Sequence, residues 1–292
     1  MLLTAAMIWG CAFVAQSVGM DYLGVLSFSS ARALIACLTI VPIVIFFDRR
    51  SGRKPSFWGT DDPVKRKRLL TGGALCGVAL TGGSVLQQAG IALTAVGKAG
   101  FITALYIVII PVIGLFFRRR PGPLVWCAVG AALAGLYLLC MNGGFSVETG
   151  DIYLIMSAFV YSIHILLIDR FSDVDGVRLS CLQFFVFFVL SFPPALIFEK
   201  PALSGYVGAA GVLLYAGVLS SGVAFTLQIL AQKLTGAVVG SLLMSLESVF
   251  AALAGWAILG QTLSARELLG CALMFAAIVM AQLPVGKKAA VG

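Results

Sequence analysis

Long apolar runs are the feature that most constrains how this 292-residue chain can fold. A helix that crosses a bilayer needs about 20 mostly apolar residues, and these runs do not show the in/out alternation of membrane-spanning strands. We therefore expect an all-α membrane protein with ten transmembrane helices. The expected spans are residues 2–19, 25–47, 69–89, 97–117, 123–141, 151–168, 179–198, 206–229, 236–258 and 267–284. No basic region precedes the first run, so we expect a true first helix rather than a cleaved signal peptide.

The composition excludes several classes of protein. Hydrophobic residues make up 60% of the chain and charged residues 11%, against about 45–50% and about 25% in soluble domains. The seven cysteines lie in apolar runs without CxxC spacing, and the chain has one histidine. We therefore expect no disulfide framework, no metal and no other cofactor. The sequence contains no HExxH, GxSxG or GxxxxGK(S/T) pattern, which argues against an enzyme and against drive by ATP.

The positive charge is unevenly distributed along the chain. The net charge is +8, and eight of the 20 Lys and Arg residues fall within residues 48–68. With a cytoplasmic N-terminus, the inner loops and the tail hold 16 of these cations and the outer side holds three, while Arg32 lies inside the second run. This asymmetry predicts a multi-pass protein of the cell (inner) membrane with both termini in the cytoplasm. We expect the basic loop to face anionic membrane lipid rather than nucleic acid.

The two halves of the chain resemble copies of one unit. We expect a first five-helix repeat in residues 1–141, a periplasmic linker in 142–150, a second repeat in 151–284 and a cytoplasmic tail in 285–292. Thr94-Ala-Val-Gly97, which opens the fourth span, aligns with Thr235-Gly-Ala-Val238, which opens the ninth. Because five is odd, the second copy would enter the membrane from the opposite side. Such inverted repeats are typical of secondary transporters, whose substrate site lies near the midplane between the halves.

Several motifs along nearly the whole chain resemble the EamA-type branch of the drug/metabolite transporter superfamily. They are Ile8-Trp9-Gly10 with Phe13, Arg32, Gly97 to Tyr106 leading to Pro111, Gly130 to Gly135, Gly150-Asp151, Leu246 to Ala251, and Gly260-Gln261-Thr262-Leu263. The chain departs from the family pattern at Ser248, where a proline is usual, and at Gln261, where a glutamate is usual. The resemblance implies transport of metabolites such as amino acids, nucleosides or sugars, usually outward.

Four residues are expected to share one depth near the middle of the membrane. Glu247 is the twelfth residue of the ninth span, about 16 Å along it at about 1.5 Å per residue. Tyr106 is its counterpart in the fourth span by the Thr94/Thr235 alignment, and Trp9 and Tyr161 are counterparts at mid-span. Charged groups inside spans are costly and usually functional. We therefore predict a substrate pocket of three aromatic rings and one carboxylate, in which Glu247 could also couple transport to protons.

Further polar residues extend the candidate site. Arg32, Lys98, Gln16 and Gln87 lie toward the outer side and could contact a carboxylate or phosphate of the substrate. Lys98 could equally snorkel to the interface. His164 lies deeper on the sixth span, where it either packs with a hydrogen-bonded partner or relays a proton.

These residues predict a secondary transporter that moves a small polar metabolite by alternating access. Because the site carries both signs of charge, we expect an amino acid or a derivative, and the resemblance favours efflux. Two alternatives stay open: an exporter of cationic drugs or amines coupled to protons through Glu247, and a membrane receptor or scaffold that transports nothing. Small-molecule substrate and membrane lipid are the expected partners, and the protein could act as a monomer or a homodimer.

Overall fold

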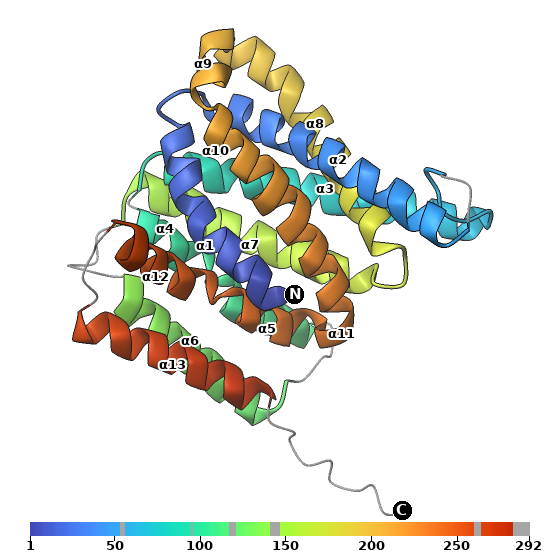
Figure 1. Cartoon of the computed structure of the whole chain (residues 1–292). Coiled ribbons are helices and arrows are strands. Elements are labelled where there is room, and N and C mark those ends of the chain that lie inside the picture. The colour runs from blue at the N-terminus through green and yellow to red at the C-terminus, as the bar shows by residue number, and fades with distance from the viewer. Residues whose placement is uncertain (53–55, 95, 117–120, 141–146, 260–263, 283–292) are drawn as a thin grey trace, which may run out of the picture.

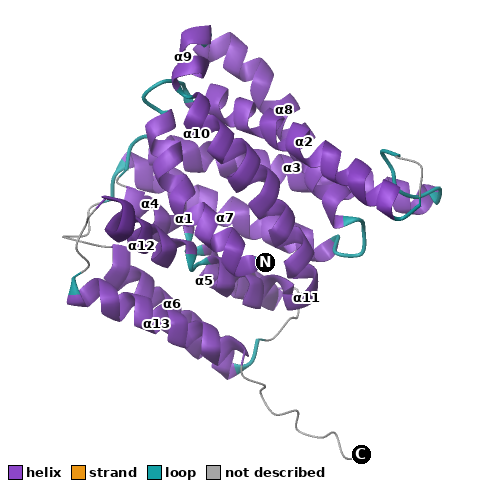
Figure 2. Ribbon diagram, in the orientation of Figure 1, coloured by secondary structure: helices purple, strands orange, loops and turns teal. Residues whose placement is uncertain are grey.

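The computed structural model describes residues 1–52, 56–94, 96–116, 121–140, 147–259 and 264–282. Within these ranges the chain forms helices and short connections and contains no strand (Figure 2). Four sequence features lie outside the described residues: Arg118 to Arg120, Gly260 to Leu263, most of the predicted linker 142–150, and the predicted tail 285–292.

The helices follow one another along the chain with few long connections (Figure 1). They are α1 (Leu2–Gly19), α2 (Val25–Arg50), α3 (Pro63–Ile91), α4 (Val96–Thr103), α5 (Tyr106–Phe116), α6 (Pro123–Cys140), α7 (Thr149–Arg170), α8 (Gly176–Pro194), the π-helix η1 (Ala195–Glu199), α9 (Leu203–Gly208), α10 (Ala210–Leu214), the π-helix η2 (Tyr215–Ala224), α11 (Phe225–Met244), α12 (Glu247–Leu259) and α13 (Ala265–Gln282).

Seven helical segments among the described residues are long and apolar enough to cross a membrane. One of them, Ala210–Leu253, contains most of the eighth and ninth predicted spans, because the helices continue past the expected boundary at residue 229. The fifth predicted span corresponds to the shorter apolar helix Pro123–Leu139, and the tenth to α13. The structure thus has the helical membrane architecture expected, although these segments do not separate into ten spans.

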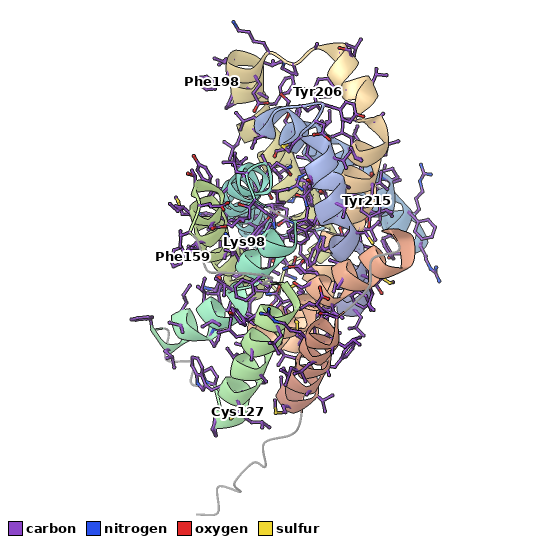
Figure 3. The ribbon with its side chains drawn as sticks, turned by 90° about the vertical axis from the view of Figure 1, so that its left-hand side faces the viewer. Lys98, Cys127, Phe159, Phe198, Tyr206 and Tyr215 are labelled. Atoms are coloured by element: carbon purple, nitrogen blue, oxygen red, sulfur yellow. The ribbon has the colours of Figure 1, made fainter. Side chains whose placement is uncertain are left out.

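The outer surface of the bundle is apolar. Phe116 is 84% exposed, Leu234 83% and Phe198 78%. Phe159 and Phe198 project outward from the helices in Figure 3. Lipid tails can cover such side chains at no cost, whereas water cannot, so this surface fits a protein whose surroundings are hydrocarbon.

Helices α2 and α8 pack side by side in opposite directions. At one end Asp48, near the end of α2, accepts two hydrogen bonds of 2.6 Å from Arg178, near the start of α8. At the other end the carboxylate of Glu199 accepts the backbone N–H groups of Leu26 and Ser27, which caps the N-terminus of α2. The first and second halves of the chain are therefore joined at both ends of this helix pair.

A salt bridge at the surface joins α3 to the connection between α7 and α8. Arg68 pairs with Asp173, and this hydrogen bond holds the pKa of the Asp173 carboxyl below its ordinary value. Because the pKa of Asp173 is lowered in the folded state, the pair stabilises the folded protein at pH values above the ordinary pKa of aspartate. This stabilisation is lost when the pH falls through the lowered pKa.

Helices α6 and α13 form a second close pair, at the lower edge of Figure 1. A Cβ atom on Gly135 would lie 2.7 Å from the carbonyl oxygen of Gly270, and a Cβ on Gly270 would lie 2.7 Å from that of Gly135. The missing side chains let the two backbones touch, as small residues do at membrane helix crossings.

Two breaks in the helices occur at positions that the alignment of the two halves pairs with each other. The fourth predicted span is divided at residues 104–105 into α4 and α5, and the ninth at 245–246 between α11 and α12. The two breaks are 141 residues apart along the chain, and the same offset aligns Thr94 with Thr235. Gly236, which has a φ of 72°, marks the kink where the ninth span begins inside α11. The breaks place Tyr106 and Glu247 at the first positions of α5 and α12.

Candidate functional site

A central cavity lies among the helices of both halves. The space between its walls is about 540 Å³, which includes the part that is open to the outside. Its lining residues are Trp9, Ala12, Phe13, Gln16, Arg32, Gln87, Thr103, Tyr106, Tyr161, His164, Ile165, Ser220, Phe225, Gln228, Met244 and Glu247. Seven of the eight residues predicted to bind substrate are among them, together with His164. A concave, mostly apolar pocket with a few polar groups is the usual form of a small-molecule site.

Glu247 and Tyr106 meet in the wall of this cavity. The Tyr106 hydroxyl donates a hydrogen bond of 3.3 Å to Glu247 Oε1, and both side chains are buried. Each residue starts a helix directly after a break, so its backbone N–H is among those that a helix start leaves without an intrahelical carbonyl. The positive end of the α12 dipole also favours a carboxylate at this position.

Trp9 is held against the second half of the chain. Its indole Nε1 donates a hydrogen bond of 3.0 Å to the carbonyl oxygen of Ser220, in the π-helical segment η2. The Tyr215 hydroxyl donates in return to the carbonyl of Ile8, at 2.7 Å. The ring of Phe225 packs edge-on against Trp9, with the ring centroids 5.0 Å apart. These contacts fix the aromatic wall on one side of the cavity.

Tyr161 lies on α7 and is bonded to α3. Its hydroxyl lies 3.0 Å from the Ser84 hydroxyl and donates to Gln87 Oε1 at 3.2 Å. Tyr161 lines the same cavity as Arg32 and Glu247. The phenol thus lies near the two opposite charges of the site.

Arg32 is the cation of the cavity. Its guanidinium Nη1 donates to Gln16 Oε1 at 2.8 Å and its charge lies 5.8 Å from the ring centre of Phe187. The side chain is 3% exposed, no carboxylate among the described residues forms an ion pair with it, and Nε has no hydrogen-bond partner there. A buried guanidinium with remaining donors is suited to bind an anionic group of a ligand.

Lys98 lies apart from the other predicted residues. Its Nζ is 2.6 Å from Asp151 Oδ2, which joins α4 to the start of α7, and it is not part of the cavity lining. Asp151 also accepts the backbone N–H of Glu148 and completes the N-terminal cap of α7. The ion pair accounts for this lysine as a contact between the two halves.

The lining residues outside the predicted set include Thr103, Ser220, Phe225 and Met244. Thr103 and Met244 precede Tyr106 and Glu247 by three residues, which places each pair on one helical face in a continuous helix. That spacing is a signal by which both could have been found. Phe225 and Ser220 lie in a segment whose sequence does not distinguish a cavity wall from ordinary packing.

No metal site is arranged within the part of the chain that the structure describes. No group of three or more His, Cys, Asp and Glu side chains is close enough there to hold an ion. The polar groups of the cavity are suited instead to bind an organic ligand by hydrogen bonds and charge.

Gly10 controls how closely α1 approaches the helix that carries Glu247. A Cβ at this position would lie 2.7 Å from the carbonyl oxygen of Glu247 and 2.8 Å from the backbone nitrogen of Ala251. We expect Gly10→Ala to force α1 and α12 apart and to lower stability by about 1–3 kcal/mol, the usual cost of overpacking. Thermal unfolding in detergent measures this effect.

Gly130→Ala is the matched control, because a Cβ on Gly130 would have no atom within 4 Å. Both substitutions add one methyl group within an apolar helix. Equal melting temperatures for the two variants would contradict the close approach of α1 to α12.

The fold and the cavity define a class of protein, a helical multi-pass membrane protein with an internal cavity. The model of the EamA-like transporter family matches residues 1–141 and 148–282. The chain therefore belongs to this family, which is part of the drug/metabolite transporter superfamily. The protein is accordingly a membrane transporter rather than an enzyme.

Two further comparisons agree with this assignment. The chain is 28% identical over 286 residues to a protein of Archaeoglobus fulgidus (strain ATCC 49558 / DSM 4304 / JCM 9628 / NBRC 100126 / VC-16) named "Uncharacterized transporter", covering 97% of this chain and 85% of the relative. It also resembles a solved structure titled "Crystal structure of protein" with a TM-score of 0.73 at 20% sequence identity. That likeness covers 96% of this chain and 94% of the other, and it concerns the fold alone.

Proposed function

We propose that this transporter moves a small zwitterion, an amino acid or a derivative, by alternating access without ATP. The observation that supports this proposal is one cavity lined by both a buried guanidinium, Arg32, and a buried carboxylate, Glu247. A zwitterion carries one group for each of them. Burial strengthens both interactions, because charges inside a protein are screened less than charges in water.

The contacts of the two charges suggest how such a ligand would lie. Arg32 Nε has no partner among the described residues, so the guanidinium can donate to a ligand carboxylate while keeping its bond to Gln16. The ligand ammonium would then lie against Glu247, beside the ring of Tyr106. Tyr161, which lines the cavity together with both charged side chains, would lie beside the bound zwitterion.

Alternating access in this proposal is a rocking of the two halves around the cavity. The packing of the helices supports an inverted repeat, because a helix of the first half and the corresponding helix of the second half contact corresponding neighbours. Helix α1 packs on η2 and α12, and α7 packs correspondingly on α3 and on α4 with α5. The corresponding helices α2 and α8 lie antiparallel. We further propose ten spans, cytoplasmic termini, residence in the cell (inner) membrane, and outward transport.

A cationic amine is the second candidate ligand. Glu247 with the aromatic rings of Tyr106 and Trp9 in the same cavity could hold an ammonium without any carboxylate on the ligand. Such a ligand would leave Arg32 unused. In that case the Glu247 carboxylate would bind either the cation or a proton, and transport of the amine would be coupled to protons through this residue.

Three ligands that differ in their charged groups separate these possibilities in a thermal-shift titration of the purified protein. Alanine carries both charges, ethylamine only the cation and propionate only the anion. A ligand that binds the folded state raises the melting temperature according to its concentration and affinity. We expect alanine to stabilise the protein and the two analogues to do so at least about tenfold more weakly. Stabilisation by ethylamine at alanine's concentration would favour the amine exporter.

Transport itself is tested in vesicles that contain the purified protein. We expect alanine, loaded on one side, to exchange with labelled alanine on the other side in the absence of ATP. A folded protein that moves no member of a broad metabolite panel would instead be a receptor or scaffold.

Arg32→Gln is expected to weaken alanine binding by at least about tenfold, because a hydrogen bond to a charged group contributes about 1.5–3 kcal/mol. The same change should leave ethylamine binding nearly as it was, since ethylamine has no carboxylate. Thermal-shift titrations of both ligands against both proteins measure this difference. A parallel loss for the two ligands would show that Arg32 supports the fold of the site rather than the carboxylate.

A further inference from the structure

Two buried hydrogen-bond acceptors at one end of the cavity have no partner among the described residues. They are Nδ1 of His164 and Oε1 of Gln228. Both residues line the cavity, and their side chains are 0% and 2% exposed. A polar atom buried without a partner costs free energy, so such atoms mark a place where a ligand group can bind.

A chain of amides determines which atom Gln228 presents. Gln232 Nε2 donates to the carbonyl oxygen of Ile165 at 2.6 Å, which leaves Gln232 Oε1 as an acceptor for its neighbour. Gln228 Nε2 donates to that oxygen at 3.3 Å. The atom of Gln228 that is left without a partner is its carbonyl oxygen, which can only accept.

His164 presents an acceptor in the same way. Its Nε2 lies 3.0 Å from Gln183 Oε1, an oxygen that can only accept, so Nε2 carries the proton in this arrangement. Nδ1 of the neutral ring is then an acceptor. Both partnerless atoms thus require a donor from whatever occupies this end of the cavity.

This end lies opposite to Arg32. Helix α1 runs antiparallel to the segment from α9 to α11, since Tyr22 lies against Gly205, Trp9 bonds to Ser220, and Leu2 lies against Gly240. Gln16, the partner of Arg32, therefore lies toward the α9 end of the aromatic wall at Trp9. Gln228 lies on the other side of it, three residues or about 4.5 Å beyond Phe225.

We infer that His164 and Gln228 form a subsite for the side chain of the ligand. This subsite selects ligands whose side chain ends in a neutral hydrogen-bond donor, such as a primary carboxamide. This inference rests on the proposed function, because Arg32 and Glu247 would hold the two charged groups of the same ligand. A primary carboxamide supplies two N–H donors for the two acceptors. A carboxylate has no donor, and a side-chain ammonium would meet only neutral acceptors after losing its hydration.

Glutamine, glutamate, methionine and alanine are the probes for this subsite. The first three have side chains of nearly equal length but different end groups, and alanine reports binding of the backbone charges alone. In thermal-shift titrations we expect glutamine to bind at least about tenfold more tightly than glutamate or methionine. A site that binds apolar and amide groups alike would show no such preference, whereas a site built to hydrogen-bond a group rejects analogues that lack it.

Gln228→Met tests the role of the acceptor directly. We expect the ratio of glutamine to alanine affinity to fall about tenfold in this variant. Gln88→Met is the matched control, because Gln88 is also a buried glutamine whose Oε1 has no partner among the described residues, but it does not line the cavity. The control should keep the wild-type ratio. Because each result is a ratio within one protein, a general loss of stability does not produce it.

The outcomes separate the two proposals. If alanine binds but glutamine binds no better than methionine or glutamate, or if Gln228→Met keeps the wild-type ratio, the subsite is wrong and the zwitterion site stands. If neither alanine nor any of the other three amino acids binds to the folded protein, the proposed function fails, and this inference fails with it.

Discussion

Glu247→Gln is expected to weaken alanine binding by at least about thirtyfold and to abolish measurable alanine exchange in vesicles. Here the buried pair is the Glu247 carboxylate and the ammonium of the ligand. Removing one partner of such a pair costs about 2–5 kcal/mol of binding free energy, and 2 kcal/mol corresponds to about thirtyfold in affinity. The substitution changes the charge and almost nothing of the shape. Its carbonyl oxygen can still accept the hydrogen bond from Tyr106. Thermal-shift titration with alanine measures the loss.

Asp21→Asn is the control for this change, because Asp21 is an exposed carboxylate in the connection after α1. It removes the same unit of charge from the chain without touching the cavity, and alanine affinity should stay within about twofold of the wild-type value. If Glu247→Gln retained alanine binding while ethylamine binding disappeared, Glu247 would bind cationic amines and not the ammonium of a zwitterion, and the proposed zwitterion site would be wrong.

The helical membrane architecture could be predicted because apolar length is a strong signal in a chain whose solvent is lipid. The interruptions of the helices could not be predicted from the sequence. The fourth and ninth spans were expected to be continuous, yet both break two residues before Tyr106 and Glu247. No glycine or proline stands at either break, so the local sequence carries no signal for them. Gly236, by contrast, was placed at the start of a span, and its positive φ marks that boundary.

The candidate site could be predicted where internal symmetry added information to the residue types. The alignment that paired Thr94 with Thr235 also paired Tyr106 with Glu247, and these two side chains meet in the structure. For Lys98 the sequence showed a cation near the membrane surface but not its neighbour Asp151, because that contact depends on how the halves pack. Phe225 is an apolar residue among many, and only the three-dimensional arrangement brings it to Trp9.

Arg178→Met is expected to destabilise the folded protein by about 3 kcal/mol, the lower end of the cost of breaking a buried salt bridge by removing one partner. The Asp48 carboxylate, which is 3% exposed, loses two hydrogen bonds of 2.6 Å from the guanidinium. The same guanidinium also donates to Asp175 and to the carbonyl oxygen of Ser56, so the connection after α2 loses support as well. Thermal unfolding in detergent measures the change.

Arg66→Met is the matched control, since Arg66 pairs with Asp61 at a similar distance of 2.8 Å, but the Asp61 side chain is fully exposed. An exposed pair contributes at most about 1 kcal/mol, so this variant should melt near the wild-type temperature. The double variant Asp48→Asn with Arg178→Met should lose less than the sum of the two single changes, because each single change already breaks the pair. Additive losses would show that Asp48 and Arg178 stabilise the protein through separate contacts, and the pair would then not be what joins α2 to α8.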